Sequence, residues 1–184
     1  MAFEATKREW SELYAFFRLL ADGKVSLGTS QTKKNDANQW PVAMVQREEH
    51  DGTRRYYIEK DDIHIVGENM DKRVPREDFH TVAGLILQAV KSSSVDDVVS
   101  PDGVEEFLDE AAIFDLEAKT DDRTDFSVAF WHPEAPLTGF NVRSRLSIMN
   151  PLLDGGRTAN LKLEQTGIKF AVPTVNKINA LPES

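Results

Sequence analysis

Two stretches of the chain repeat apolar residues at steps of three and four, which is the period of an amphipathic helix. In residues 6–21 the apolar stripe consists of Trp10, Leu13, Phe17 and Leu20. Residues 76–91 repeat the pattern, with expected buried positions at Phe79, Val82, Ala83, Ile86, Leu87 and Val90. A shorter helix is expected over residues 104–113, after the start signal Pro101-Asp102. The pattern therefore predicts three helices.

Other stretches alternate apolar and polar residues, which is the period of a β-strand. Strands are expected at residues 25–29, 41–50, 54–60, 62–67, 113–118, 125–131, 137–146 and 161–165. The Asp51-Gly52 dipeptide between two alternating runs predicts a hairpin. The polar runs 31–39, 92–101 and 150–160 are expected loops. This order of elements predicts an α/β (α+β) fold with a central mixed β-sheet flanked by helices.

Length and composition narrow the class of protein. The chain has 184 residues, of which 40% are hydrophobic and 29% charged, as expected for one ordinary globular domain. Its apolar runs are too short for a membrane-spanning helix, and MAFEATKREW has no apolar segment of a secretory signal. There are no cysteines, which excludes disulfides and thiolate zinc sites. We therefore expect a cytoplasmic protein with no membrane partner.

Charge is distributed unevenly along the chain. The net charge is −9, but residues 61–130 alone carry −12, whereas residues 140–184 carry +3. A uniformly acidic protein binds polyanions poorly, but a locally basic face can still attract them. The basic end of the chain is therefore where a polyanion is expected to bind.

The predicted strand 137–146 has two chemically different faces. One face consists of Phe140, Val142, Ser144 and Leu146. The other face carries an amide and two guanidiniums, from Asn141, Arg143 and Arg145. Asp125 opens the preceding predicted strand, so an antiparallel connection would bring its carboxylate close to Asn141 and Arg143. A carboxylate on one strand and a D/E-x-K pair on the next is the layout of PD-(D/E)xK nucleases, in which carboxylate oxygens hold Mg²⁺.

Three segments occur in an order that resembles the HpaII-like type II restriction endonucleases. They are EWSELY at Glu9–Tyr14, GFNVRS at Gly139–Ser144, and the segment Pro151–Leu161. The family's sequences are similar to EWSELY, GFSIKS and PTLLNAS-x-x-TNF at these places. The resemblance covers essentially the whole chain and predicts a single restriction-endonuclease-like domain over residues 1–184. The family's enzymes are nearly twice as long, so the chain would match their amino-terminal half, as a truncated piece or a naturally short relative.

The resemblance implies Mg²⁺-dependent cleavage of double-stranded DNA at a short palindromic site, as in a restriction-modification system. Asp125 would be the metal-binding aspartate, and Glu12, or alternatively Glu9, the helix carboxylate beside it. Asn141 and Arg143 would occupy the positions that read x-[Ile/Val]-Lys in the family. Because dimeric enzymes match the symmetry of palindromes, a homodimer is expected.

The chain departs from the family pattern at Arg143. Arginine stays charged and cannot act as a general base, but it can hold a phosphate with two hydrogen bonds. The sequence therefore predicts retained phosphate binding with catalysis in question. The expected DNA-contacting residues, rich in the usual base-reading types, are Arg145, Asn150, Arg157, Thr158 and Asn160.

Structural roles remain open for the candidate residues. Asp125 could be an ordinary strand-start acid, Glu9 only the capping-box partner of Thr6, and Glu12 a solvated helix acid. Arg143 and Arg145 could pair with the acidic middle of the chain.

Other functions are also open. The chain could be a DNA-binding or regulatory module without catalysis, or a protein-interaction domain that uses the acidic segment 95–125. The four histidines lack zinc-site spacing, and no phosphate-binding glycine motif is present, so no nucleotide cofactor is expected.

Overall fold

The computed structural model of the protein describes residues 4–28, 34–116, 124–132 and 134–147. The chain divides into two compact units, residues 1–150 and 151–184. Every described residue belongs to the first unit. The predicted loop 150–160 and strand 161–165 lie outside the described residues.

The first helix is delimited by two local signals. The short strand β1 (Glu4–Thr6) leads directly into α1 (Lys7–Asp22). The Glu9 carboxylate accepts the backbone N–H of Thr6 at 2.7 Å, and the Thr6 side chain accepts the backbone N–H of Glu9 at 3.3 Å. At the other end Gly23 has a φ of 63°, a left-handed conformation that glycine adopts without a Cβ penalty. The predicted capping box is confirmed.

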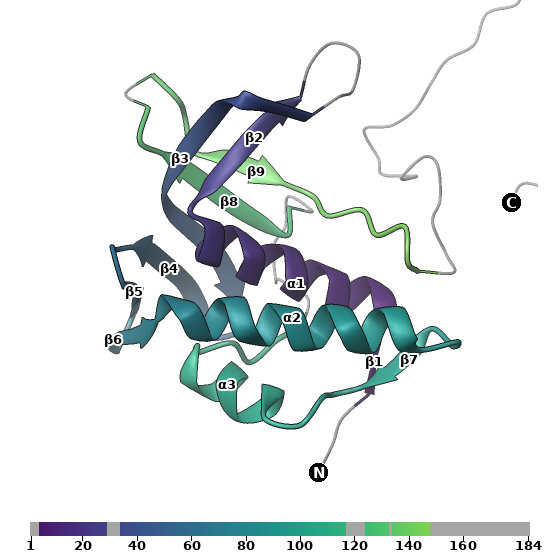
Figure 1. Ribbon diagram of the computed structural model, residues 1–184. Helices are drawn as coiled ribbons and strands as arrows, with labels where there is room; N and C mark the ends of the chain where they lie inside the picture. Colours follow the sequence, from purple (N-terminus) through teal and green to yellow (C-terminus); the bar gives the residue numbers. More distant parts are fainter. Residues whose placement is uncertain (1–3, 29–33, 117–123, 133, 148–184) are drawn as a thin grey trace, which may run out of the picture. The chain divides into compact units, whose positions relative to one another are not determined.

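Two further helices follow. Helix α2 (Arg76–Ser92) lies alongside α1, and the shorter α3 (Val104–Glu110) packs beneath α2 (Figure 1). The predicted helices at 6–21 and 76–91 are confirmed, whereas the third ends three residues before its predicted end, at Glu110.

The main sheet is a seven-stranded antiparallel structure with the order β6-β5-β4-β3-β8-β9, and β2 also pairs with β3. Its strands are β2 (Lys24–Gly28), β3 (Lys34–Glu49), β4 (Gly52–Ile58), β5 (Asp62–Gly67), β6 (Met70–Pro75), β8 (Phe126–Phe130) and β9 (Thr138–Phe140). The predicted hairpin turns at Asp51-Gly52, with Glu49 paired to Gly52. The α+β class is confirmed, but the sheet is not mixed, because every described strand pair is antiparallel. Short connections explain this for β3-β4, β4-β5, β5-β6 and β8-β9, whereas β8 returns to pair with β3 after the chain has passed through α2 and α3.

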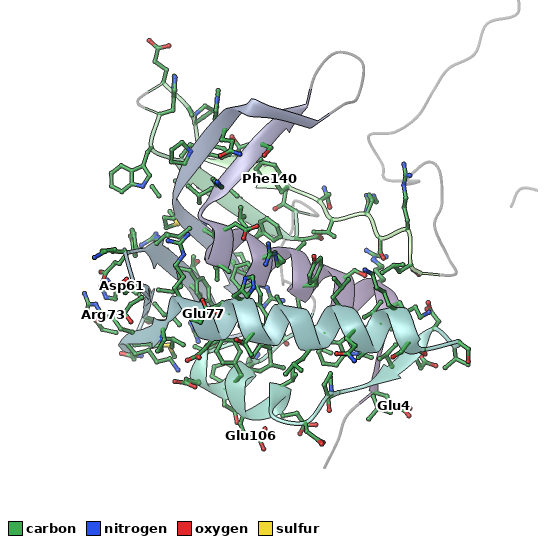
Figure 2. The ribbon with its side chains drawn as sticks, viewed as in Figure 1. Glu4, Asp61, Arg73, Glu77, Glu106 and Phe140 are labelled. Atoms are coloured by element: carbon green, nitrogen blue, oxygen red, sulfur yellow. The ribbon has the colours of Figure 1, made fainter. Side chains whose placement is uncertain are left out.

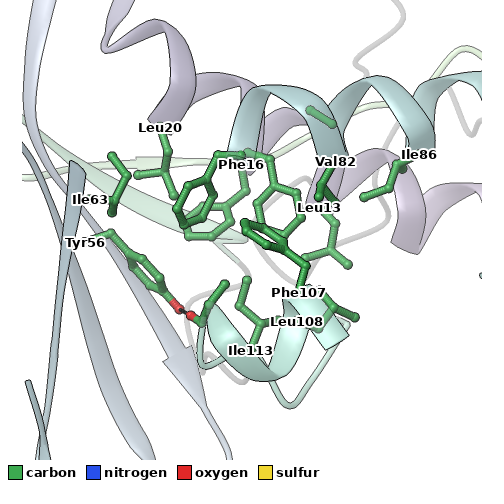
Figure 3. Packing of buried hydrophobic residues seen from close by; sticks show 14 of the residues in the cluster. Leu13, Phe16, Leu20, Tyr56, Ile63, Val82, Ile86, Phe107, Leu108 and Ile113 are labelled. Carbon is green, nitrogen blue, oxygen red and sulfur yellow. Dashed lines mark hydrogen bonds between the residues drawn. The ribbon is translucent and has the colours of Figure 1, made fainter. Parts of the chain in front are cut away.

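The core lies between the helices and one face of this sheet. Leu13, Phe16 and Leu20 of α1 face Tyr56 and Ile63 of the sheet, and residues of α2 and α3 close the cluster (Figure 3). The Phe16 ring meets Tyr56 edge-on at 4.9 Å, a favoured aromatic geometry. The buried Tyr56 hydroxyl donates to the Ala111 carbonyl at 3.1 Å, so this polar group within the core has a hydrogen-bond partner.

Three strands, β1, β6 and β7 (Asp97–Val99), were not expected from the sequence, and a fourth is longer than expected. Strand β3 begins at Lys34, inside the polar run 31–39, because backbone pairing with β2 does not require apolar side chains. Strand β6 is polar because it is an edge strand with one neighbour. The loop expected at 92–101 contains β7, which pairs with β1 in a separate two-stranded sheet. Strands of three residues are too short for alternation to reveal.

Two expected strands are wrong in whole or in part. Of the strand expected at 113–118, the described residues 113–116 form no strand, and residues 117–118 lie outside the described residues. The carbonyls of Asp115 and Leu116 accept hydrogen bonds from the Arg47 side chain and not from a neighbouring strand. The strand expected at 137–146 is paired only over Thr138–Phe140, since the chain then leaves β8 and runs along α1 (Figure 1).

Candidate functional site

Asp125 lies directly before β8, where β8 and β9 separate. Phe126 pairs with Phe140 across these strands, and the Asp125 N–H donates to the Phe140 carbonyl at 2.8 Å. The Asp125 carboxylate in turn accepts the backbone N–H of Val142. Continuing the register places Asn141 opposite Asp125. The expected proximity of Asp125 to residues 141–143 is therefore confirmed, while their chemical roles remain predictions.

Segment 141–147 keeps the predicted alternation without being a paired strand. Asn141, Arg143 and Arg145 are exposed, whereas Val142 and Ser144 are partly buried. Phe140, at the start of this stretch, packs on the edge of the core and is labelled in Figure 2. Asn141, Arg143 and Arg145 are therefore accessible to a ligand in solution.

The helix carboxylate Glu12 lies in a buried ionic network. Its side chain is 7% exposed, and Oε1 lies 3.6 Å from Nη2 of Arg47 on β3. The Arg47 side chain is fully buried, forms an ion pair with Glu49, and has its guanidinium 5.9 Å from the Phe16 ring centroid. The structure thus pairs Glu12 with Arg47 and Asp125 with Val142, so the two proposed metal carboxylates have different partners.

Arg47 and Glu49 also hold the backbone that leads toward Asp125. Arg47 Nη2 donates to the carbonyls of Asp115 and Leu116 at 2.7 and 2.8 Å. Glu49 accepts the N–H groups of Phe114 and Asp115 at 3.0 and 2.9 Å. Burial raises the pKa of the Glu49 carboxyl above its ordinary value, and the neighbouring Arg47 opposes this shift.

The network of Glu12, Arg47 and Glu49 was not predicted from the sequence. The feature that could have revealed it is that Arg47 and Glu49, of opposite charge, occupy the next two inward positions of the strand after the buried Val45. Inward charges on a strand require partners, because isolated buried charges are strongly unfavourable.

Of the remaining candidate site residues, Glu9 has a clear structural role, and four expected DNA-contacting residues lie outside the described part of the chain. The backbone N–H and the hydroxyl of Thr6 both donate to the Glu9 carboxylate at 2.7 Å, so the Glu9 side chain performs its helix-capping role. Among the described residues, no three His, Asp or Glu side chains gather around one point that could hold a metal. Asn150, Arg157, Thr158 and Asn160 lie outside the described residues.

The acidic charge is concentrated around α3. Residues 95–116 contain eight acidic residues and no lysine or arginine. Their longest ordered element is α3, which lies on the other side of α2 from segment 141–147 (Figure 1). The acidic segment nevertheless reaches segment 141–147, because the Ser147 hydroxyl lies 3.4 Å from the Asp96 carboxylate.

This antiparallel sheet, covered by helices and carrying Asp125 beside Asn141 and Arg143, is consistent with the restriction-endonuclease-like class of folds. Comparison of the sequence with known proteins is more specific. The chain belongs to the HpaII restriction endonuclease family, whose profile it matches over residues 6–184. The predicted resemblance is confirmed.

A curated relative is the type II restriction enzyme HpaII of Haemophilus parainfluenzae. The two sequences are 26% identical over 187 aligned residues, which cover 98% of this chain and 52% of the relative. The chain therefore spans about half the length of the curated relative it matches. No solved structure matches the chain significantly. None of the described helices is long and apolar enough to cross a membrane.

Proposed function

We propose that this chain is the nuclease part of a type II restriction endonuclease, which hydrolyses phosphodiester bonds of double-stranded DNA with Mg²⁺. The observation that carries the proposal is the hydrogen bond from Val142 to the Asp125 carboxylate, in a member of this family. It holds a carboxylate at the place where an amide and a guanidinium, from Asn141 and Arg143, emerge from the sheet.

The donor atoms at this place fit Mg²⁺. A carboxylate from Asp125 and a carboxamide from Asn141 are oxygen ligands of the kind that Mg²⁺ prefers. Mg²⁺ commonly keeps several waters and relies on one or two carboxylates plus substrate phosphates, so an open site is sufficient. The Val142 N–H fixes the orientation of the Asp125 carboxylate. When bound, Mg²⁺ would activate a water nucleophile and offset charge on the phosphate.

Glu12 is a weaker candidate for a metal ligand than Asp125. Its carboxylate is buried and lies 3.6 Å from the Arg47 guanidinium. It would reach a metal ion only by giving up part of this pairing. Its contact with Arg47 already links α1 to β3, and the Arg47 side chain in turn binds the carbonyls of Asp115 and Leu116.

Arg143 and Arg145 would bind the DNA backbone. Both side chains are exposed on the same side of segment 141–147. A guanidinium binds phosphate oxygens bidentately and stabilises the extra negative charge of the transition state. Because arginine stays protonated, Arg143 would act through charge and position and not by removing a proton from water.

A short palindromic site and a homodimer complete the proposal. Symmetric sites are matched by two-fold symmetric proteins, since each half-site then meets the same residues. Base reading is assigned to Asn150, Arg157, Thr158 and Asn160, whose residue types make the common base contacts.

A second candidate function follows from Arg143 itself. If a lysine is required at this position, the chain would bind DNA without cleaving it and would act as a binding or regulatory module. The same site residues would then hold phosphates without supporting hydrolysis.

The test is incubation of the pure protein with supercoiled plasmid, in Mg²⁺ or in EDTA, beside Arg143→Lys. Arg73→Lys is a matched control, because Arg73 is exposed on β6, at the opposite edge of the sheet from β9 (Figure 2). Mg²⁺-dependent cleavage by the wild type supports the nuclease. Cleavage by Arg143→Lys alone favours the binding module. If neither variant cleaves or binds DNA, both functions are wrong.

A further inference from the structure

Segment 142–146 is anchored on α1 and α2 through alternate residues. Val142 and Leu146 line a groove of about 220 Å³ with Tyr14 and Ala15 of α1 and Leu87 of α2, and the exposed Arg143 and Arg145 also border it. Ser144 lies between these two apolar contacts and faces Ser11. Val142 and Ser144 are partly buried against the helices, whereas Leu146 borders the groove and is 40% exposed.

The polar contact joins two motifs that are far apart in sequence. The hydroxyl oxygens of Ser11, in EWSELY, and Ser144, in GFNVRS, lie 2.7 Å apart. Ser11 Oγ also lies 2.6 Å from the Lys7 carbonyl, and Ser144 Oγ accepts the Leu146 N–H at 3.1 Å. Each hydroxyl has one hydrogen, so all three contacts are satisfied when Ser11 donates to Lys7 and Ser144 donates to Ser11.

This chain of hydrogen bonds ends on a well-held part of α1. Lys7 is buried, its Nζ donates to the Ser93 carbonyl at 2.8 Å, and its N–H donates to the Asp96 carbonyl at 2.8 Å. Ser11 itself is 8% exposed. Ser144 is thus connected, through Ser11, to the start of α1 and to the end of α2.

We propose that Ser11 is a positioning residue that fixes Arg143 and Arg145 toward DNA by holding Ser144 between them. The assignment to DNA rests on the proposed function. The anchorage itself does not, because it follows from the contacts of the folded chain. Alternation along an extended segment means that holding Ser144 inward turns both neighbouring side chains outward.

The physical reason for needing such an anchor is the absence of strand pairing. Beyond Phe140 the described segment has no partner strand, so no ladder of hydrogen bonds fixes its register. A shift by one residue would exchange the inward and outward faces and would bury the arginines. Two contacts select one register: the Val142 N–H donates to the Asp125 carboxylate, and the Ser144 hydroxyl meets the hydroxyl of Ser11.

Limited proteolysis with trypsin tests the anchorage without DNA, because trypsin cleaves after Arg143 and Arg145. Ser11→Ala and Ser144→Ala are each expected to increase the rate of cleavage at these two sites about fivefold, the equilibrium effect of losing one ordinary hydrogen bond. Ser11→Thr is expected to restore the wild-type rate, because a helical threonine can keep both hydroxyl contacts and the groove admits its methyl group. Ser92→Ala, on the exposed side of α2, is the matched control.

DNA binding by the same variants separates the two proposals. If both alanine variants accelerate tryptic cleavage after Arg143 and Arg145 and weaken binding to a DNA duplex, with rescue by Ser11→Thr, the positioning role is supported. Accelerated cleavage in a protein whose wild type binds no DNA supports the anchorage and overturns the proposed function. Tryptic cleavage and DNA binding of Ser11→Ala that both equal those of wild type would overturn the positioning role.

Discussion

The carboxylate of Asp125 accepts a hydrogen bond from the backbone N–H of Val142, 17 residues further along the chain. This bond joins the start of β8 to the segment that follows β9, and it places the charged Asp125 beside the exposed Asn141 and Arg143. Such an arrangement orients a carboxylate by a backbone N–H that every residue except proline would supply at position 142. The orientation of this carboxylate is thus set in part by the main chain.

Arg143 and Arg145 are predicted to contribute separately to DNA affinity. Each phosphate contact changes the slope of log affinity against log salt by about 0.9. Arg143→Ala and Arg145→Ala should therefore each reduce the magnitude of this slope by about 0.9. Binding is measured with a short duplex in EDTA, from low to moderate salt, with Arg73→Ala as the control. Unchanged slopes in both variants would remove these arginines from the DNA interface.

Arg47→Met is predicted to destabilise the fold strongly. The substitution leaves the carboxylates of Glu12 and Glu49 buried without their cation, and the cost of breaking a buried ion pair is about 3–5 kcal/mol. Urea unfolding of the variant measures this loss. Arg73→Met, which breaks an exposed pair with Glu59, should leave the unfolding midpoint nearly unchanged. Equal midpoints for Arg47→Met and wild type would show that the network does not stabilise the core.

The helices and the hairpin could be predicted because their signals are local. The capping box at Thr6 and Glu9 and the Asp51-Gly52 turn each act within a few residues, and each occurs in the structure. Alternation also indicated which of residues 140–145 face outward, although the strand itself ends at Phe140. Periodicity reports burial of a face, and it does not require a paired strand.

The parts that could not be predicted depend on distant partners. Nothing near Arg47 shows that its guanidinium will meet the carbonyls of residues 68 and 69 positions later. The pairing of β1 with β7 likewise joins segments that are far apart in sequence, with Glu4 opposite Val99, and each of these strands has only three residues. The contact of Ser11 with Ser144 spans 133 positions, and its two motifs were identified by resemblance and not by spacing.

Glu49 is predicted to make stability depend on pH. Its pKa is raised in the folded state, mainly by burial, so the folded protein binds its proton more tightly than the unfolded chain does. The resulting stabilisation is fully present below the unfolded value of about 4.5 and is lost as the pH rises through the folded pKa. Glu49→Gln should remove this part of the pH dependence.

Urea unfolding between acidic and neutral pH checks the prediction for Glu49. The difference in unfolding free energy between wild type and Glu49→Gln should fall as the pH rises, because only the wild type has the carboxyl. A difference that is constant over this range, or that grows with pH, would contradict the sign of the shift.

Asp125→Asn is the variant that tests the central claim most directly. Asparagine keeps an oxygen that can accept the Val142 N–H, so the segment stays in place while the negative charge for Mg²⁺ is lost. Asp61→Asn is the matched control, because Asp61 is exposed beside β5, far from β9 in the sheet (Figure 2).

The measurement is the single-turnover rate of plasmid cleavage in Mg²⁺ by wild type, Asp125→Asn and Asp61→Asn. Losing several kcal/mol of metal-assisted catalysis should slow Asp125→Asn by at least about 100-fold, with DNA binding retained. Asp61→Asn should cleave at the wild-type rate. Cleavage by Asp125→Asn at the wild-type rate would contradict the assignment of this carboxylate to the metal site.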